Sequence, residues 1–413
     1  MNRESRSDTR LSLVRLLEQD VVADPYPLYR QLQSEDPVHW DPFLHAWVVT
    51  RYPDVIKVLH TFSASRTPNA EKFIAMGLAP DNPIGKTLIK QMLYMDAPDH
   101  TRLRGLAAAA FTPRRVEVLR DFIQKIVDDL LDRVQARGQM DIMADFADPM
   151  PAMVTAEMIG VPVEDSLRLK KLSADFAEIL GNFHHDPDRI PEILDSTSKL
   201  TEYFQAAIAE ARQRPREGLI NSFLTAGDGG DRLSDEDIVA NCILTMIGGL
   251  ETTTNLIGIG LLTLTRNPGK LARLRDDPSL IPTAVEELLR FESPVQHTGR
   301  IAPEDVEMGG KQIRKGQSVM AVIAAANRDP ERFPDPDELI LDRQDNKHLA
   351  FGWASHFCFG APLARMKVQI AFKTLLRRLP NLKVTPGPLT WRSNHGLRGL
   401  DALPVTFDAP GME

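Results

Sequence analysis

The chain has 413 residues, of which 43% are hydrophobic and 26% are charged, a composition typical of a folded globular protein. Forty-nine basic and 57 acidic residues leave a net charge of −8, which argues against a general nucleic-acid binder. Two cysteines allow at most one disulfide, so we expect a cytoplasmic protein and not a secreted disulfide scaffold. The charged first 20 residues contain no apolar run, and we expect neither a signal peptide nor a membrane anchor.

The N-terminal part of the chain mixes short helices and strands. We predict a helix over 27–35, strand-like segments at 37–40 and 46–50, and a short helix at 52–60. Helical periodicity then dominates from about residue 97 to residue 291. Apolar residues recur at three- and four-residue steps from Leu119 to Leu131, which predicts an amphipathic helix over 116–134. Further helices are predicted at 150–159, 164–180, 191–213, 235–266 and 279–291.

After residue 299 the pattern changes to short apolar segments separated by glycine turns. Residues 299–322 predict a small sheet, and residues 362–379 predict a helix. The C-terminal part carries strand-like segments at 382–384 and 403–407. We therefore predict a mainly α protein: a single large helical domain with small β-sheets.

The helix at 235–266 is unusually long and apolar. Ser234 and Asp237 predict a capping box at its start, and Asn267 marks its end. Its middle is apolar on nearly all faces, which indicates burial. A membrane span is the alternative, but Glu251 near the centre would cost about 2.5–3.5 kcal/mol in a bilayer. A buried core helix is therefore the favoured interpretation.

The centre of this helix combines residues that are poor helix formers with an acid. Gly248-Gly249 and the three threonines Thr252 to Thr254 predict a widened or bent turn beside Glu251, with threonine hydroxyls bonded to the preceding turn. A buried carboxylate is expensive unless it is paired or functional. Two interpretations stay open: a functional site, or a Glu251 held by a salt bridge with Gly248 serving helix packing.

The segment FGWASHFCFGAPLAR at 351–365 places Cys358 just before a helix that opens at Pro362. Backbone amides and the helix dipole there favour a thiolate, and the flanking phenylalanines exclude water. Cys358 is then a candidate soft metal ligand, for example the single axial thiolate of a haem iron. A nucleophile paired with His356, or an inert buried cysteine, are the alternatives. No ligand spacing for zinc is present.

This loop resembles the haem-binding loop of the cytochrome P450 monooxygenases, Phe-Gly-x-Gly-x-His-x-Cys-x-Gly. The matching residues are Phe351, Gly352, His356, Cys358 and Gly360. The resemblance implies that Cys358 is the axial ligand, Phe351 shields it, and His356 contacts a haem propionate. The chain departs from the family pattern where Ala354 replaces the usual second glycine.

Three further motifs occur in the order of the family. Gly248 to Thr252 resembles the oxygen-activating signature, although Leu250 replaces a common histidine. Glu287 and Arg290 resemble the Glu-x-x-Arg pair, for which the resemblance implies a structural role. The third arginine of that cluster is not assigned. The segment 96–104 resembles the haem-flanking helix, and Arg300 matches a further propionate-binding arginine.

The resemblance runs from about residue 22 to residue 407 and implies a soluble bacterial-type haem monooxygenase. Residues 1–21 are then expected to be an N-terminal extension and residues 22–413 the haem-thiolate monooxygenase domain. It implies haem b, bound through the Cys358 thiolate. Besides the loop residues, the cofactor-binding residues are expected to be His100, Arg104, Gly248 and Arg300. Glu251 and Thr252 are the expected catalytic residues, relaying protons during O2 activation.

The expected reaction inserts one oxygen atom, by hydroxylation or epoxidation, into a hydrophobic small molecule, for example a secondary metabolite. Leu244, Ile247 and Val295 are the expected substrate contacts, with mobile loops near 63–93 and 178–192. His184 and His185 in the second loop are expected to be exposed residues and not ligands.

Electrons are expected from a ferredoxin and its reductase, because the chain shows no flavin or nicotinamide motif. The docking face near Cys358 is expected to be basic. Its candidate residues are Arg102, Arg114, Arg115, Arg365 and Lys367. Two alternatives remain: a haem sensor or carrier without turnover, which would not need Glu251 and Thr252, and a peroxide-driven peroxygenase.

Overall fold

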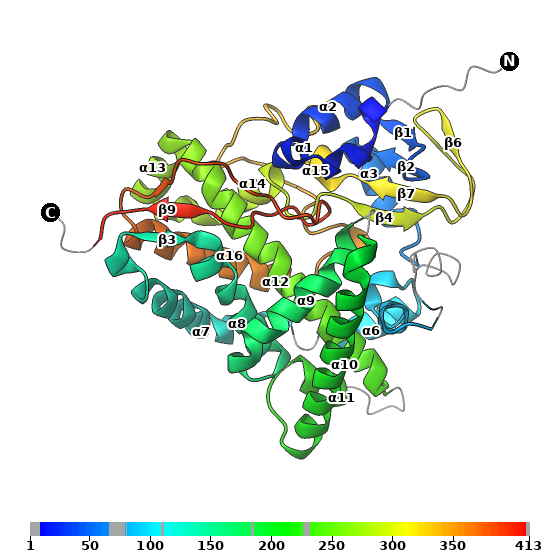
Figure 1. Ribbon diagram of the computed structural model, residues 1–413. Coiled ribbons are helices and arrows are strands. Elements are labelled where there is room, and N and C mark those ends of the chain that lie inside the picture. Colours follow the sequence, from blue (N-terminus) through cyan, green and yellow to red (C-terminus); the bar gives the residue numbers. More distant parts are fainter. Residues whose placement is uncertain are drawn as a thin grey trace.

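The computed structural model describes residues 9–65, 79, 81–108, 111–182, 186–225 and 232–409. The fold is mainly helical with small sheets, as predicted, and the largest sheet lies to one side of the helices (Figure 1). The helices are α1 (Gln19–Ala23), α2 (Tyr26–Glu35), α3 (Tyr52–Thr61), α5 (Pro83–Leu88), α6 (Asp99–Ala108), α7 (Pro113–Asp132), α8 (Pro149–Ile159), α9 (Ser166–Gly181), α10 (Ile190–Gln213), α11 (Leu219–Thr225), α12 (Asp235–Arg266), α13 (Pro268–Asp276), α14 (Ile281–Phe291), α15 (Ile323–Ala326) and α16 (Ala361–Arg378).

The observed helices agree with the predicted ones to within a few residues. One correction concerns the expected mobile loop at 63–93. Within it, α5 forms a helix because the Asn82 side chain accepts a hydrogen bond from the Gly85 amide at 2.8 Å and caps the first turn. Most of the remainder of that loop, and His184 and His185 in the second loop, lie outside the described residues.

The strands form three small sheets. A four-stranded sheet has the order β1 (Val38–Asp41), β2 (Ala46–Val49), β7 (Ser318–Ala321) and β4 (Thr298–Ile301), with only the β2–β7 pair parallel. A three-stranded sheet has the order β3 (Gln139–Asp141), β9 (Pro404–Thr406) and β8 (Lys383–Val384). The third sheet is the hairpin of β5 (Val306–Met308) and β6 (Lys311–Ile313).

The segment predicted as one sheet at 299–322 is therefore divided between two. Strands β5 and β6 close on each other because Gly309 and Gly310 both have positive φ, at 57° and 72°, as a tight two-residue turn requires. Strands β4 and β7 instead pair with the N-terminal strands. Sequence periodicity identifies such strands but not their partners.

Helix α12 crosses the middle of the molecule, between α8, α9 and α10 on one side and α16 on the other (Figure 1). The predicted capping box is present, since Ser234 and Asp237 each accept a hydrogen bond from the other's backbone amide. The helix is the one in the described ranges that is long and apolar enough to cross a membrane, yet 78% of its most apolar window is buried inside the protein. It is the core helix that the sequence indicated.

The described part of the expected N-terminal extension packs against the sheet side of the molecule. Leu13 and Leu16 are buried, and Asp41 accepts hydrogen bonds from the Ser12 hydroxyl and the Leu13 amide at 2.9 and 3.0 Å. The boundary at residue 22 stays a sequence prediction.

A fully buried ion cluster joins α14 to the segment that leads to the cysteine loop. Glu287 and Arg290 form a two-bond pair at 2.8 Å, and neither side chain is exposed. Arg343 adds a second arginine at 3.1 Å from both Glu287 oxygens. Arg290 also donates to the carbonyls of Asn327 and Pro336 at 2.9 Å. Arg343 is thus the second arginine that binds Glu287, which the sequence analysis left unassigned.

Replacing Glu287 with alanine is expected to lower the free energy of unfolding by about 3–5 kcal/mol, because two arginines lose their carboxylate in a buried site. Denaturant unfolding followed by circular dichroism measures the loss. The matched control is Glu117→Ala, which removes another i,i+3 pair, with Arg120, whose side chains are 60% and 52% exposed. This control is expected to leave stability unchanged. Equal losses in the two variants would contradict a structural role for Glu287.

Candidate functional site

Cys358 lies in a tight loop that connects a 3-10 turn (Ala354–His356) to α16. The Cys358 amide donates to the Phe351 carbonyl at 2.8 Å, and the Ala361 amide donates to the Cys358 carbonyl at 3.3 Å. Gly352 has φ 73°, which favours glycine. Ala354 also has positive φ, at 55°, so its Cβ costs about 1–2 kcal/mol in this left-handed conformation. The glycine of the resembled pattern would avoid that cost.

Opposing influences act on the pKa of the Cys358 thiol. Burial raises the pKa of the thiol above its ordinary value. The Gly360 backbone amide and the cations of Arg104, Lys367 and Arg365 oppose this shift without reversing it. A coordinated metal deprotonates a thiol outright, so the site fits a metal-bound thiolate better than a free one.

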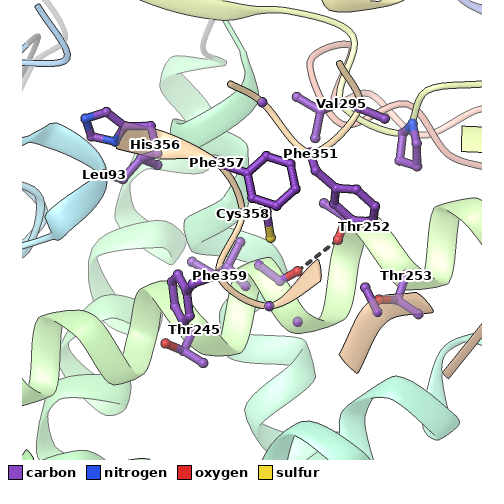
Figure 2. Close-up of a pocket in the computed structure, with 18 of the residues that line it drawn as sticks. Leu93, Thr245, Thr252, Thr253, Val295, Phe351, His356, Phe357, Cys358 and Phe359 are labelled. Carbon is purple, nitrogen blue, oxygen red and sulfur yellow. Dashed lines mark hydrogen bonds between the residues drawn. The ribbon is translucent and has the colours of Figure 1, made fainter. Parts of the chain in front are cut away.

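A largely apolar cavity of about 330 Å³ lies between this loop and α12 (Figure 2). The Cys358 sulfur and the Thr252 hydroxyl belong to its lining. The cavity brings together nearly all residues that the sequence singled out. They are His100, Arg104, Leu244, Ile247, Gly248, Thr252, Val295, Arg300, Phe351, Gly352, His356, Cys358 and Gly360.

One part of the wall collects cationic and potentially cationic groups: His100, Arg104, Arg300 and His356. The rings of His100 and His356 stack with centroids 4.0 Å apart. Burial lowers the pKa of His100, and the charges of Arg104 and Arg300 lower it further. Groups that repel one another in a buried wall favour an anionic ligand. A dianionic cofactor edge such as the two haem propionates fits this wall.

The two glycines of α12 have different surroundings. A Cβ at Gly248 would meet nothing within 4 Å, so this position leaves open space toward the cavity. A Cβ at Gly249 would lie 2.7 Å from Thr155 Oγ1, so Gly249 permits the close approach of α8. Helix packing therefore depends on Gly249, whereas the sequence had offered Gly248 for that role. The space beside Gly248 and the Cys358 sulfur fit a haem between them.

Thr252 and Glu251 point in different directions. The Thr252 hydroxyl donates to the Gly248 carbonyl at 2.8 Å, the predicted bond to the preceding turn, and lines the cavity (Figure 2). Glu251 is not among the described residues lining the cavity. Its carboxylate accepts from Arg392 at 2.9 Å, and Arg392 also donates to Asp148 at 3.0 Å. Of the two interpretations that the sequence allowed for Glu251, the structure shows the salt bridge.

Lys367 does not belong to the basic docking face that was expected from the sequence. It is 1% exposed, and its Nζ donates to the Gly249 carbonyl at 2.7 Å, beside the cavity. Burial lowers its pKa to about 7, and Cys358 opposes this shift. Arg365, from the same expected face, forms two 2.7 Å bonds with Glu286. The burial of Lys367 could have been predicted from its position on the apolar face of α16, one turn after Leu363.

His297 is a further cavity residue that the sequence analysis missed. It is 7% exposed, and burial lowers its pKa to about 4, so the imidazole is neutral at pH 7. It lies in the same segment as Val295, which bridges to Leu397 of the C-terminal segment. Leu244, Ile247 and Leu397 complete an apolar region of the wall.

Gly248→Ala is expected to leave the protein more stable than Gly249→Ala by about 1–3 kcal/mol, the usual cost of overpacking. Both changes gain the same helix propensity, but only the Cβ at 249 meets Thr155. Denaturant unfolding of both variants measures the difference. Thr155→Ala, which removes the two closest atoms, is expected to restore the stability of the Gly249→Ala variant. Equal stability of the two single variants would contradict the close approach.

The sequence profile of the cytochrome P450 family matches residues 70–396. The chain is 38% identical to the biotin biosynthesis cytochrome P450 of Bacillus subtilis over 94% of this chain and 98% of the relative. It is 41% identical to nocardicin C N-oxygenase of Nocardia uniformis over 94% and 96%.

Solved structures of similar fold are also cytochrome P450s. P450BioI, in complex with hexadec-9Z-enoic acid ligated acyl carrier protein, has a TM-score of 0.88 at 38% identity, with 94% of this chain and 100% of that chain covered. CYP109E1 from Bacillus megaterium in complex with testosterone has a TM-score of 0.86 at 33% identity, with 94% and 99% covered. Proteins of this family are monooxygenases that bind haem b through a cysteine thiolate. This chain belongs to the cytochrome P450 family and is a haem-dependent monooxygenase.

Proposed function

We propose that this monooxygenase inserts one oxygen atom into a hydrophobic small molecule at a haem held by Cys358. One observation carries the proposal: the Cys358 sulfur and the Thr252 hydroxyl reach the same apolar cavity from two different segments of the chain (Figure 2). When bound, the haem supplies the reductive activation of O2, and the protein supplies ligand, orientation and protons.

The remaining wall residues divide the task of holding the cofactor. His100, Arg104, Arg300 and His356 bind its propionates, because arginine can bind a carboxylate through two bonds and a histidine ring N–H can donate to one. Phe351 covers the loop that carries Cys358, and its carbonyl holds the Cys358 amide. Gly352 and Gly360 keep the loop compact. Gly248 leaves the space in which the cofactor and O2 meet α12.

Proton delivery falls to Thr252 and Glu251 in unequal ways. The Thr252 hydroxyl donates to the Gly248 carbonyl, so its oxygen keeps free acceptor capacity toward the cavity and can pass a proton there. Arg392 binds one oxygen of Glu251, and the other oxygen is buried without a hydrogen-bond partner among the described residues, so Glu251 can take up a proton there and deliver it after its side chain turns toward the cavity. Thr252 therefore acts directly at the cavity, and Glu251 acts as its supply.

The substrate is a hydrophobic small molecule, of the kind represented by a secondary metabolite, which the enzyme hydroxylates or epoxidises. Leu244, Ile247 and Val295 contact it from the apolar wall, and His297 adds a neutral polar group beside them. Testosterone and a 16-carbon acyl chain, named with two structural relatives, support this class of substrate.

A ferredoxin and its reductase supply the electrons in the cytoplasm. The Cys358 loop reaches the surface at Phe357, a residue that is 38% exposed. Arg114 and Arg115 are exposed on the first turn of α7, and Arg102 lies on α6. An acidic ferredoxin complements these arginines. Lys367 has no part in this face because it is buried.

Cys358→Ser is expected to remove the strongly red-shifted Soret band of the dithionite-reduced, carbon monoxide-treated protein, because that band reports a thiolate ligand. The matched control is Cys242→Ala. Cys242 is the other cysteine and is buried in α12, and its replacement is expected to keep the band. A Cys358→Ser protein that kept the band would place the ligand elsewhere. Absence of any haem band in the unmodified protein would refute haem binding itself.

Thr252→Ala is expected to lower product formed per electron consumed and to raise peroxide release, because a proton donor at the cavity is lost. Haem content and the red-shifted band are expected to stay unchanged. Thr253→Ala is the control, since Thr253 lines the same cavity one residue along the helix. An equal loss of coupling in both variants would mean that cavity shape, and not the Thr252 hydroxyl, controls the yield.

A further inference from the structure

Lys367 is the feature of the cavity that the proposed function does not use. Its side chain belongs to α16, the helix that begins three residues after Cys358, and it crosses to α12. Its Nζ donates to the Gly249 carbonyl at 2.7 Å, and the side chain is almost completely buried. A single side chain thus links the helix behind the ligand loop to the turn that carries Thr252.

A buried lysine is a poor choice for stability alone. Moving an amine or ammonium group out of water is costly, and an apolar side chain of similar length would fill the same space without that cost. Lys373 on the same helix is exposed, so α16 also has a solvent face for lysine. The position of Lys367 therefore indicates a role beyond folding.

The acceptor of Lys367 explains what that role is. A threonine in a helix can donate its hydroxyl to the carbonyl either three or four residues earlier. For Thr252 these carbonyls belong to Gly249 and Gly248. Lys367 holds the first, and the Thr252 hydroxyl bonds the second at 2.8 Å. Without Lys367, the Gly249 carbonyl at the cavity wall would compete for the hydroxyl or for water.

We propose that Lys367 is a positioning residue: its Nζ–H donates to the Gly249 carbonyl and thereby fixes the Gly248 carbonyl as the acceptor that orients the Thr252 hydroxyl. The inference rests on the proposed role of Thr252. The hydrogen bond requires only a donor, and both the charged and the neutral amine provide one. Lys367 also ties the Thr252 turn to α16, so the distance between that turn and the Cys358 loop is held from within the protein.

Lys367→Met tests this inference, because methionine fills similar space without a donor. The product yield per electron is expected to fall several-fold toward that of Thr252→Ala, with more peroxide. The thermal midpoint is expected to be equal or higher, since a buried polar group is removed. The infrared C–O stretching band of the reduced carbon monoxide complex is expected to shift, because the cavity wall changes. Lys373→Met, the same change on the exposed face of α16, is expected to alter none of these.

The double variant Lys367→Met/Thr252→Ala decides whether Lys367 acts through Thr252. It is expected to be no less coupled than Thr252→Ala alone, because residues acting as one unit are non-additive. A further loss in the double variant, or full coupling in Lys367→Met, would overturn the inference. Normal coupling in Thr252→Ala would instead refute the proposed proton role. If Lys367→Met does not load haem, Lys367→Leu enters the same assays with the same expectations.

Discussion

Helix α12 packs closely against α8 at Gly249, and this contact forms part of the cavity wall. With a Cβ at this position the Thr155 side chain would have to shift, because its Oγ1 would lie 2.7 Å from that Cβ. The next residue toward the N-terminus, Gly248, faces open space instead. The two adjacent glycines therefore have different roles. Gly249 allows α12 to pack closely against α8, and Gly248 leaves space beside α12 on the cavity side. Because of the space beside Gly248, the apolar core helix α12 forms one wall of the cavity.

The opposite wall is held by a chain of contacts that starts at the buried ion cluster. Glu287 binds Arg290 and Arg343, and Arg290 in turn binds the carbonyl of Asn327. The Asn327 side chain accepts from the Leu349 amide at 2.7 Å, and the Leu349 carbonyl accepts from Gly352. The cysteine loop is therefore linked to α14 through a series of side-chain and backbone hydrogen bonds. This explains why a charge cluster outside the cavity can matter for the geometry of Cys358.

The fold class, the helix bounds and most residues of the cavity wall could be predicted from the sequence, because they depend on local periodicity and on motifs with fixed spacing. Contacts between residues far apart along the chain could not be predicted in this way. Arg392 reaches Glu251 across 141 residues, and Arg343 reaches Glu287 across 56, and no local pattern announces either contact. Helix geometry already indicates that adjacent residues need not share a cavity, because successive residues of a helix point about 100° apart. Thr253 lines the cavity with Thr252, whereas Glu251 is not among the described lining residues.

The turn that carries Thr252 is held from three directions. Helix α8 packs against Gly249, Lys367 of α16 binds the Gly249 carbonyl, and Arg392 of the C-terminal segment binds Glu251. The contacts of Lys367 and Arg392 each engage a polar group, the Gly249 carbonyl and one Glu251 oxygen respectively. With the Gly249 carbonyl bound by Lys367 and one Glu251 oxygen bound by Arg392, the hydroxyl-bearing residues Thr252 and Thr253 form the cavity side of this turn. In the proposed function, rigid placement of the Thr252 hydroxyl directs protons to a single point and so favours oxygen insertion over loss as peroxide.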